Sequence, residues 1–373
     1  MKRRAFIQTG LALGVAGVSG PASALALAPS RRSTVDGVIR LNSNENPLGL
    51  APAARQAVID GLTEANRYPG AKRAELTEAL AAKHGVTPEN IVLGAGSTEI
   101  LQMMVQATAT RRTTLVLPDP TFEHVSRYSL PETYRSEVVP LASGFAHDLQ
   151  RMRELAQRSW DPVLVYICNP NNPTGTLTSC ADIDSWIQSS PDNVRFMVDE
   201  AYFEYADDRG YWSSLKWIKD RPNVVVVRTF SKIFAMAGMR LGYGIAHPTT
   251  AALLRQFMSS ANVNELALRA GLASLADSGL VGRSQAANSQ AKDTLYQCLQ
   301  ELDIEYIPTH TNFVLHRIKG DLQTYIGRMR EHNIRVGRPF PPMLTYNRVS
   351  LGLPEEMDRF TETLRMFRSK NWV

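Results

Sequence analysis

A single lysine lies within a group of residues whose side chains suit covalent chemistry. The valines 224–227 are followed by Thr229, Ser231 and Lys232, and Arg240 comes eight positions after the lysine. A poorly hydrated lysine loses its proton readily and becomes a nucleophilic amine that condenses with an aldehyde. Two hydroxyls and a forked guanidinium are donors that suit a phosphate. This segment predicts a Schiff-base lysine beside a phosphate site, with a solvated loop lysine as the alternative.

A carboxylate follows a second buried strand. The run 195–198 ends directly in Asp199, and Tyr202 comes three positions later. A carboxylate at the end of a buried strand needs a positive partner, because its removal from water is costly. A protonated pyridine nitrogen and an arginine both meet that need, and the motif leaves these two alternatives open.

Two loops add polar groups after other predicted strands. The turn 94–99 holds Gly96 and Ser97 at a helix start, which suits a phosphate, although a simple small-residue cap has the same pattern. The segment 169–175 holds three asparagines, including Asn172, and a rigid turn explains its prolines better than its asparagines. Ligands collect at the carboxyl ends of strands in α/β sheets, so we expect these loops to meet there.

One ligand accounts for all these groups together. It must offer an aldehyde to Lys232, a phosphate to the hydroxyls and arginine, a ring nitrogen to Asp199, and a flat face to Phe122 after the turn 118–121. Pyridoxal 5'-phosphate has these four features. The sequence therefore predicts a pyridoxal-phosphate site and no metal site.

The rest of the chain predicts the scaffold that positions these residues. Apolar runs of strand length alternate with helix-length segments, which is typical of a mainly parallel sheet covered on both faces. We expect an α/β fold whose large domain has seven strands, at 91–93, 114–117, 138–141, 163–168, 195–198, 224–228 and 241–246. A smaller α+β domain should follow, so the predicted order is signal peptide 1–28, N-terminal arm 29–50, large domain 51–255 and small domain 256–373.

The N-terminus predicts an export signal. Lys2, Arg3 and Arg4 precede an apolar run and then the small-residue sites 22–24 and 26–28. A charged start, an apolar run too short to span a bilayer and Ala-x-Ala sites are typical of a signal peptide, and the paired arginines resemble the bacterial twin-arginine class. We expect a periplasmic or exported protein that meets the membrane only in transit, with an uncleaved anchor as the alternative.

Composition sets few further limits. Without the three N-terminal cations, 38 basic residues remain against 36 acidic ones, a balance that does not call for nucleic acid. Cys168, Cys180 and Cys298 form neither an even framework nor a Cys-x-x-Cys pair, so we expect them to serve as packing residues.

Several ordered motifs resemble one enzyme family. The segment 169–175, Asp199 with Tyr202, and Ser231-Lys232 with Arg240 are similar to the fold-type-I aminotransferases of classes I and II. Further motifs resemble the histidinol-phosphate aminotransferase subgroup, and these lie at 44–49, 68–69, 96–99 and 348–352. The resemblance runs from about residue 40 through most of the chain.

The resemblance implies a role for each matching residue. Lys232 would bind the cofactor aldehyde and move the substrate proton, and Asp199 would pair with the pyridine nitrogen. Asn172 and Tyr202 would hydrogen-bond the phenolic oxygen, and Phe122 would stack on the ring. The phosphate would be held by Ala95, Gly96, Ser97, Thr229, Ser231 and Arg240, joined by Tyr68 of the other subunit. Arg348 would bind the substrate carboxylate, with Asn172 and Glu45 nearby, and the shared site implies a homodimer.

The implied activity is transfer of an amino group from an L-amino acid to a 2-oxo acid in two half-reactions. The amino acid would be histidinol-phosphate-like, aromatic or other. A lyase or decarboxylase on the same scaffold is the alternative. Two features depart from the subgroup: the chain carries the predicted export signal, and Gly337 stands where an arginine usually follows the valine, with Arg335 and Arg338 close by.

Overall fold

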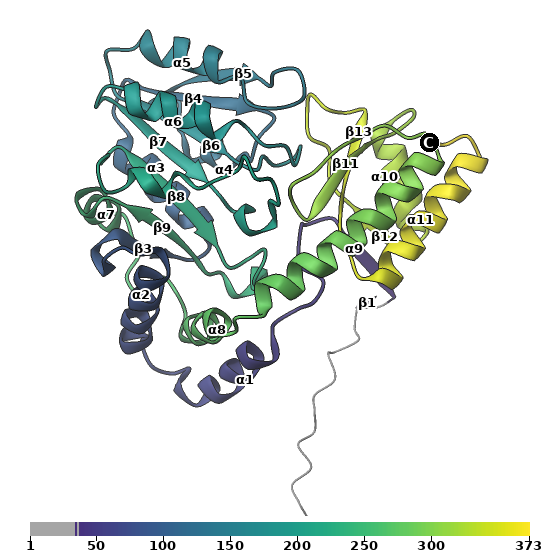
Figure 1. The fold of residues 1–373 in the computed structure, drawn as a ribbon, viewed down its shortest axis with the longest axis horizontal. Coiled ribbons are helices and arrows are strands. Elements are labelled where there is room, and N and C mark those ends of the chain that lie inside the picture. Colours follow the sequence, from purple (N-terminus) through teal and green to yellow (C-terminus); the bar gives the residue numbers. More distant parts are fainter. Residues whose placement is uncertain (1–33, 36) are drawn as a thin grey trace, which may run out of the picture. The chain divides into compact units, whose positions relative to one another are not determined.

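A seven-stranded sheet organises the larger part of the molecule (Figure 1). The computed structural model describes residues 34, 35 and 37–373, so the predicted signal peptide at 1–28 lies outside the described residues. The strands lie in the order β3-β9-β8-β7-β6-β4-β5, and β9 alone is antiparallel to its neighbours β3 and β8. The predicted seven-stranded, mainly parallel sheet is confirmed, and its strands are β3 Ile91–Gly94, β4 Thr113–Asp119, β5 Tyr134–Pro140, β6 Val163–Cys168, β7 Val194–Asp199, β8 Val224–Thr229 and β9 Gly242–Ala246.

Helices cover both faces of this sheet. Successive strand residues point to opposite faces, so their side chains are buried alternately under one layer of helices and under the other. On β8, Val224 and Val226 belong to one buried cluster, while Val225 and Val227 belong to another. The first cluster includes α1 Pro52–Gly61, α2 Gly70–His84, α5 Leu149–Gln157, α6 Cys180–Ser189 and α8 Glu265–Ala276. The second includes α3 Ser97–Thr108, α4 His124–Tyr128 and α7 Pro248–Arg255. Strands that are apolar at every position are therefore explained by burial on both faces.

A separate buried cluster belongs to the C-terminal part of the chain. It lies among three helices and two small sheets of three strands each, of order β10-β11-β13 and β1-β2-β12. Their bounds are α9 Leu280–Glu301, α10 Leu322–Glu331, α11 Pro354–Ser369, β10 Tyr306–Ile307, β11 Phe313–Arg317, β13 Tyr346–Ser350, β1 Thr34–Val35, β2 Val38–Leu41 and β12 Ile334–Val336. The long helix α9 leads from the end of the large sheet to these smaller sheets (Figure 1). The domain boundary at residue 255 stays a prediction, and the buried side chains of α8 pack in the cluster of the large sheet.

The predicted N-terminal arm contributes strands and then crosses toward the large sheet. Its strand β2 pairs in parallel with β12, with Ile39 opposite Ile334. Further along, the Asn46 amide donates to the Ile233 carbonyl at 3.0 Å and to the Ser284 hydroxyl at 2.9 Å. The arm is therefore held at one end by the small sheet and at the other by the loop that follows β8.

Helix α10 and strand β12 were absent from the sequence prediction. Helix α10 carries Gly327 in its middle, which weakens a helical pattern, yet the Asp321 carboxylate caps its first turn by accepting from the Thr324 amide at 2.7 Å. Strand β12 has only three residues and forms because β2 lies beside it. Both elements depend on tertiary contacts that a local pattern does not contain.

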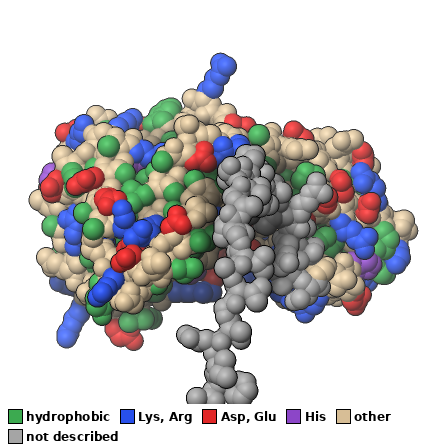
Figure 2. All heavy atoms as spheres, turned by 90° about the horizontal axis from the view of Figure 1, so that it is seen from below, with side chains coloured by type: hydrophobic (Ala, Val, Ile, Leu, Met, Phe, Trp, Pro, Cys, Tyr) green, Lys and Arg blue, Asp and Glu red, His purple; other side chains and the backbone are tan. Residues whose placement is uncertain are grey.

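The described surface carries charges of both signs. Figure 2 shows basic and acidic side chains interspersed over the face drawn. None of the helices within residues 34, 35 and 37–373 is long and apolar enough to cross a membrane. Cys168, Cys180 and Cys298 are all unpaired and buried.

A buried ion pair joins the ends of β7 and β8. The Arg228 guanidinium lies 2.6 Å from the Glu200 carboxylate, and the two side chains are 4% and 2% exposed. Arg228 also pairs with Glu204 at 3.3 Å and lies 3.7 Å from the centre of the Phe203 ring. Glu200 accepts further hydrogen bonds from the hydroxyl of Ser213 and the amide of Ser214. This network fixes the spacing of the two strand ends on the face opposite Asp199.

We expect Arg228→Met to destabilise the protein by about 3–5 kcal/mol, because it leaves the Glu200 carboxylate buried without its counter-charge. Urea unfolding of the cofactor-free protein at fixed concentration measures the change. The matched control is Arg151→Met, which removes an exposed ion pair to Glu154 and should leave the midpoint unchanged. Equal midpoints for Arg228→Met and wild type would show that the pair does not hold the strands.

Candidate active site

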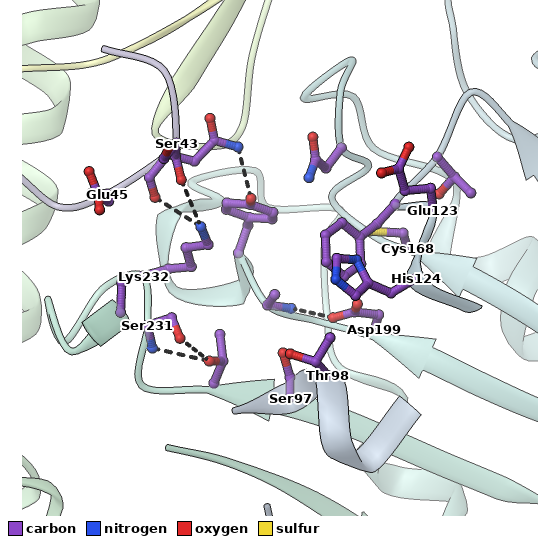
Figure 3. A pocket seen from close by; sticks show the side chains of 18 of the residues that line it. Ser43, Glu45, Ser97, Thr98, Glu123, His124, Cys168, Asp199, Ser231 and Lys232 are labelled. Carbon is purple, nitrogen blue, oxygen red and sulfur yellow. Dashed lines mark hydrogen bonds between the residues drawn. The ribbon is translucent and has the colours of Figure 1, made fainter. Parts of the chain in front are cut away.

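A pocket of about 490 Å³ lies at the carboxyl ends of the central strands (Figure 3). Segments far apart in the chain meet there: the arm, the loops after β3, β4, β6, β7 and β8, and strand β13. Most of the predicted site residues line it, namely Glu45, Ser97, Phe122, Asn172, Asp199, Tyr202, Thr229, Ser231, Lys232, Arg240 and Arg348. The roles assigned to them stay predictions, but their convergence in one cavity is a property of the fold.

Lys232 reaches into this pocket from the loop after β8 (Figure 3). Its Nζ donates to the carbonyl oxygens of Asn44 at 3.0 Å and Ser43 at 3.4 Å. Burial, and next the Arg348 guanidinium, lower the pKa of Lys232 to about 7. The amine therefore reaches its neutral, nucleophilic form near neutral pH.

Asp199 ends β7 as a buried carboxylate that is only 2% exposed. Its oxygens accept from the Tyr166 hydroxyl at 3.0 Å and from the Ala201 amide at 3.1 Å. Within the described part of the chain it forms no ion pair, and burial raises its pKa to about 6. The sequence left open whether Asp199 pairs with an arginine. The nearby arginine, Arg228, pairs with Glu200 instead, so Asp199 can stabilise a cation that enters the pocket.

A turn and a guanidinium form a cradle at the start of α3. Gly96 precedes the helix with a φ of 78°, and the Arg240 guanidinium donates to the Thr98 hydroxyl at 3.1 Å and to the Ala95 carbonyl at 3.4 Å. A Cβ at Gly96 would lie 2.2 Å from Arg240 Nη2, so only glycine leaves room for the guanidinium. Ala95 and Gly96 thus lie beside the Arg240 guanidinium, and neither of them lines the pocket itself.

Two hydroxyls complete this cradle on the side of β8. The Thr229 hydroxyl lies 2.9 Å from that of Ser231 and accepts from the Ser231 amide at 3.0 Å. Arg240 has no carboxylate partner among the residues described, so its charge is available to a ligand. A helix start, a guanidinium and hydroxyls together suit a phosphate.

Arg348 is a second cation of the pocket without a carboxylate partner in the described chain. It is buried in β13, where its guanidinium donates to the Asn172 side-chain oxygen at 2.7 Å and to the Asn42 carbonyl at 3.1 Å. Its Nε is buried without a hydrogen-bond partner, and burial lowers the pKa of Arg348 to about 10. A carboxylate entering beside Asn172 would compensate the charge of the guanidinium.

The pocket also contains residues that the sequence prediction did not assign to the site, namely Glu123, His124, Arg338 and Phe340. Phe122 stacks on His124 with 4.4 Å between ring centres, and Glu123 beside them pairs with Arg338 at 2.9 Å. Arg338 also lies 4.2 Å from the centre of the Phe340 ring. These side chains all line the pocket.

The structure also explains the glycine at position 337. A Cβ there would lie 2.5 Å from the Arg348 carbonyl oxygen, so the two backbones approach too closely for a side chain. Arg338 lines the active-site pocket, whereas Arg335 lines a separate groove together with Arg330. Of the two arginines near Gly337, only Arg338 is therefore placed to contact a ligand in the pocket.

Tyr68 does not line the pocket and is 92% exposed. Conversely, Asn44 and Tyr166 were not predicted to contribute. Tyr166 lies two residues before Cys168 on β6, where Cys168 pairs in register with Asp199, so strand alternation could have placed it beside the carboxylate. No pattern in the sequence signals the contacts of Asn44.

Comparisons with known proteins agree with this geometry. Residues 36–364 match the family "Aminotransferase class I and II". The chain is 37% identical to a histidinol-phosphate aminotransferase of Moorella thermoacetica over 90% of this chain and 86% of that protein. It is 35% identical to histidinol-phosphate aminotransferase 1 of Cupriavidus pinatubonensis over 88% of each chain. The crystal structure of histidinol-phosphate aminotransferase from Sinorhizobium meliloti in complex with pyridoxal-5'-phosphate is 26% identical with a TM-score of 0.83, over 89% of this chain and 90% of that one.

The chain therefore belongs to the aminotransferase class I and II family. It is a pyridoxal-phosphate-dependent aminotransferase, and its substrates are amino acids and 2-oxo acids. The pocket fits the cofactor: the amine of Lys232, the uncompensated carboxylate of Asp199 and the cradle around Arg240 match its aldehyde, ring nitrogen and phosphate. When bound, the cofactor withdraws electrons from the amino acid so that a proton can leave its Cα.

The lowered pKa of Lys232 predicts a distinctive reactivity in the cofactor-free protein. Because a depressed pKa means that the neutral amine predominates above about pH 7, modification by trinitrobenzenesulfonate should reach half its maximal rate near pH 7. Mass spectrometry of the peptide that contains Lys232 measures the rate. Free Nα-acetyl-lysine is the control, since an ordinary lysine titrates at about 10.4. A Lys232 profile that coincides with the control would refute the shift.

The space at Gly96 predicts a specific loss of cofactor affinity. Gly96→Ala should displace the Arg240 guanidinium and raise the dissociation constant for pyridoxal phosphate at least about tenfold, the effect of one charge-assisted hydrogen bond. Fluorescence titration of the cofactor-free protein measures it. Gly327→Ala on α10 is the control, because a Cβ there meets nothing within 4 Å. Unchanged affinity in Gly96→Ala would remove Arg240 from the phosphate site.

Proposed function

We propose that this aminotransferase moves the amino group of an L-amino acid to a 2-oxo acid by a ping-pong scheme of two half-reactions, with Lys232 as the residue that binds the cofactor covalently. One observation carries the proposal: a lysine with a pKa of about 7 shares a pocket with Asp199, a buried carboxylate that has no cation partner among the described residues. A neutral amine and an unpaired acid are what the two ends of the cofactor ring require.

The other side chains then take roles that follow from their positions. Once it is released from the cofactor, Lys232 is the base that accepts the Cα proton, because its pKa of about 7 lets it take up a proton near neutral pH. Tyr202 and Asn172 flank the place of the phenolic oxygen, and Phe122 offers a flat face beside it. Arg348, whose charge has no carboxylate partner among the described residues, holds the substrate carboxylate, and Glu45 lines the pocket from the arm.

The side-chain preference is proposed from the relatives and from the outer pocket. The relatives named above act on histidinol phosphate according to their names, and histidinol phosphate is the first amine to test. The wall formed by Phe122, His124, Arg338 and Phe340 combines aromatic rings with a cation, which suits an aromatic, imidazole-bearing or anionic side chain.

Steady-state assays of the purified holoprotein test this function. A panel with histidinol phosphate, aromatic and acidic amino acids is assayed with 2-oxoglutarate as acceptor. We expect parallel double-reciprocal lines, and we expect Lys232→Ala to lose both turnover and the visible absorbance of the bound cofactor. Arg348→Lys should raise KM for the carboxylic substrate at least about tenfold, because a lysine cannot replace the bidentate fork. Release of ammonia or carbon dioxide without formation of an amino-acid product would instead identify a lyase or a decarboxylase.

A homodimer is proposed from the exposure of Tyr68. Ile59, Leu62 and Tyr68 lie close together in sequence and are 45%, 58% and 92% exposed. A second subunit would cover these apolar side chains, and it would bring Tyr68 to the phosphate of its neighbour. Light scattering should give the mass of a dimer. Mixing inactive Lys232→Ala with inactive Tyr68→Ala should restore activity in the mixed dimer, which carries one intact site, and failure to do so would argue against a shared site.

Export of the chain is proposed from its first residues alone. The charged start with paired arginines, the short apolar run and the small-residue sites support a twin-arginine-type signal. Fractionation of cells that express the full chain, compared with an Arg3→Lys, Arg4→Lys variant, tests it. Mature protein in the periplasm only for the wild type is the expected result, and equal distribution would refute it.

A further inference from the structure

We propose that Asn44 is a positioning residue that orients two donors of the site, the Tyr202 hydroxyl and the Lys232 amine. The inference rests on the proposed roles of Tyr202 and Lys232 toward the cofactor. It assigns a role in the active site to a residue of the N-terminal arm and gives a reason why the arm lines the pocket. It is carried by the backbone conformation of Asn44 and by its hydrogen bonds to four parts of the chain.

The backbone of Asn44 is held in a conformation that most residues avoid. Its φ is 54°, in the left-handed region, and the residue is only 2% exposed. Asparagine tolerates this region better than other residues with a Cβ, but the surrounding structure must still maintain it. The backbone N–H of Asn44 donates to the Ser350 hydroxyl at 2.8 Å, and its backbone carbonyl accepts from the Asn312 side chain at 3.0 Å. Two residues of the C-terminal part of the chain, Ser350 and Asn312, therefore hold the backbone N–H and carbonyl of Asn44.

The side chain of Asn44 has a defined orientation. Because the Ser350 oxygen already accepts from the Asn44 amide, its own hydrogen is available for the Asn44 side-chain oxygen, which lies 3.3 Å away. This contact assigns the oxygen of the side-chain amide and turns its nitrogen toward the Tyr202 hydroxyl, 3.0 Å away. Asn44 is therefore a donor to Tyr202.

Donation by Asn44 determines what the Tyr202 hydroxyl can do. A phenol has one hydrogen, and burial raises the pKa of Tyr202, so that hydrogen is retained. Since an amide nitrogen cannot accept it, the hydrogen must point elsewhere, and Tyr202 lines the active-site pocket. Asn44 thus keeps Tyr202 as a hydrogen-bond donor toward the ligand.

The carbonyl of Asn44 acts on Lys232 in a related way. A neutral amine has two hydrogens and one lone pair. The carbonyls of Asn44 and Ser43, at 3.0 and 3.4 Å, can accept both hydrogens, and Figure 3 shows Lys232 pointing toward this segment of the arm. The lone pair, which attacks an aldehyde carbon, is then the part of the amine left free for a ligand.

The effect on Tyr202 is tested by the pH titration of the visible absorbance of the holoprotein. A donor to the phenolic oxygen disfavours protonation of the nearby nitrogen that links the cofactor to Lys232, so loss of the donor should raise the midpoint. Asn44→Gly tolerates the left-handed backbone and removes the amide. We expect Tyr202→Phe to raise the midpoint by about one pH unit, the effect of one hydrogen bond, and Asn44→Gly, which keeps the hydroxyl but no longer orients it, to raise the midpoint by a smaller amount. The double variant should shift no further than Tyr202→Phe alone, because Asn44 acts on the midpoint only through the Tyr202 hydroxyl.

The outcomes separate this inference from the proposed function. A shift in Tyr202→Phe without one in Asn44→Gly, or shifts that add in the double variant, would overturn the role of Asn44 alone. No shift in either variant would overturn the role of Asn44 together with that of Tyr202. Retained visible absorbance in Lys232→Ala would instead overturn the proposed function.

The effect on Lys232 is tested without cofactor. The rate of its modification by trinitrobenzenesulfonate should be kept in Asn44→Gly, which preserves the carbonyl position. It should fall severalfold in Asn44→Ala, where the Cβ strains the left-handed backbone and displaces the carbonyl. Asn42→Ala controls for a substitution elsewhere in the arm and should keep the wild-type rate, since the Asn42 side chain hydrogen-bonds the Ser43 hydroxyl and neither Lys232 nor Tyr202. Equal rates in Asn44→Ala and Asn44→Gly would show that the carbonyl does not orient the amine.

Discussion

The buried ion pair between Arg228 and Glu200 is the constraint on which the site depends. Glu200 follows Asp199 directly, and Arg228 directly precedes Thr229, so each partner lies next to a residue of the pocket. Adjacent residues of a strand point to opposite faces. The ion pair therefore fixes the strand ends from behind, while Asp199 and the loop with Lys232 face the ligand. The positions of Asp199 and of the loop with Lys232 therefore depend on an ion pair, between Arg228 and Glu200, whose members do not line the pocket.

The pocket itself is built from charges that the fold leaves uncompensated. Asp199, Arg240 and Arg348 form no ion pairs among the described residues, and burial shifts the pKa of Asp199 upward and those of Lys232 and Arg348 downward. Each shift means that burial already disfavours the charged form of that side chain before any ligand binds. A ligand with a complementary charge at each position recovers that free energy, which favours the cofactor and an amino acid over neutral molecules.

Much of the fold and of the cofactor side of the site could be predicted from the sequence. The strands were visible because burial on both faces makes them apolar throughout, as in Val224–Val227. Lys232, Asp199 and Arg240 were visible because they directly follow such strands or lie in the loop between two of them. The contacts of Asn44 and Arg338 were not, because they join residues hundreds of positions apart: Asn44 meets Ser350 and Arg338 meets Glu123 only after the chain has folded. Short β12 was hidden for the same reason.

The reversed direction of β9 has a consequence for how the cofactor would be carried. Since β9 runs antiparallel to β8, the chain returns to the sheet through one short connection that contains both Lys232 and Arg240. The proposed covalent anchor, Lys232, and the proposed phosphate anchor, Arg240, are thus parts of a single loop and are separated by seven intervening residues. A small displacement of that loop would translate both attachment points together, so the ring would shift relative to Asp199 and the substrate without being stretched between its own two anchors.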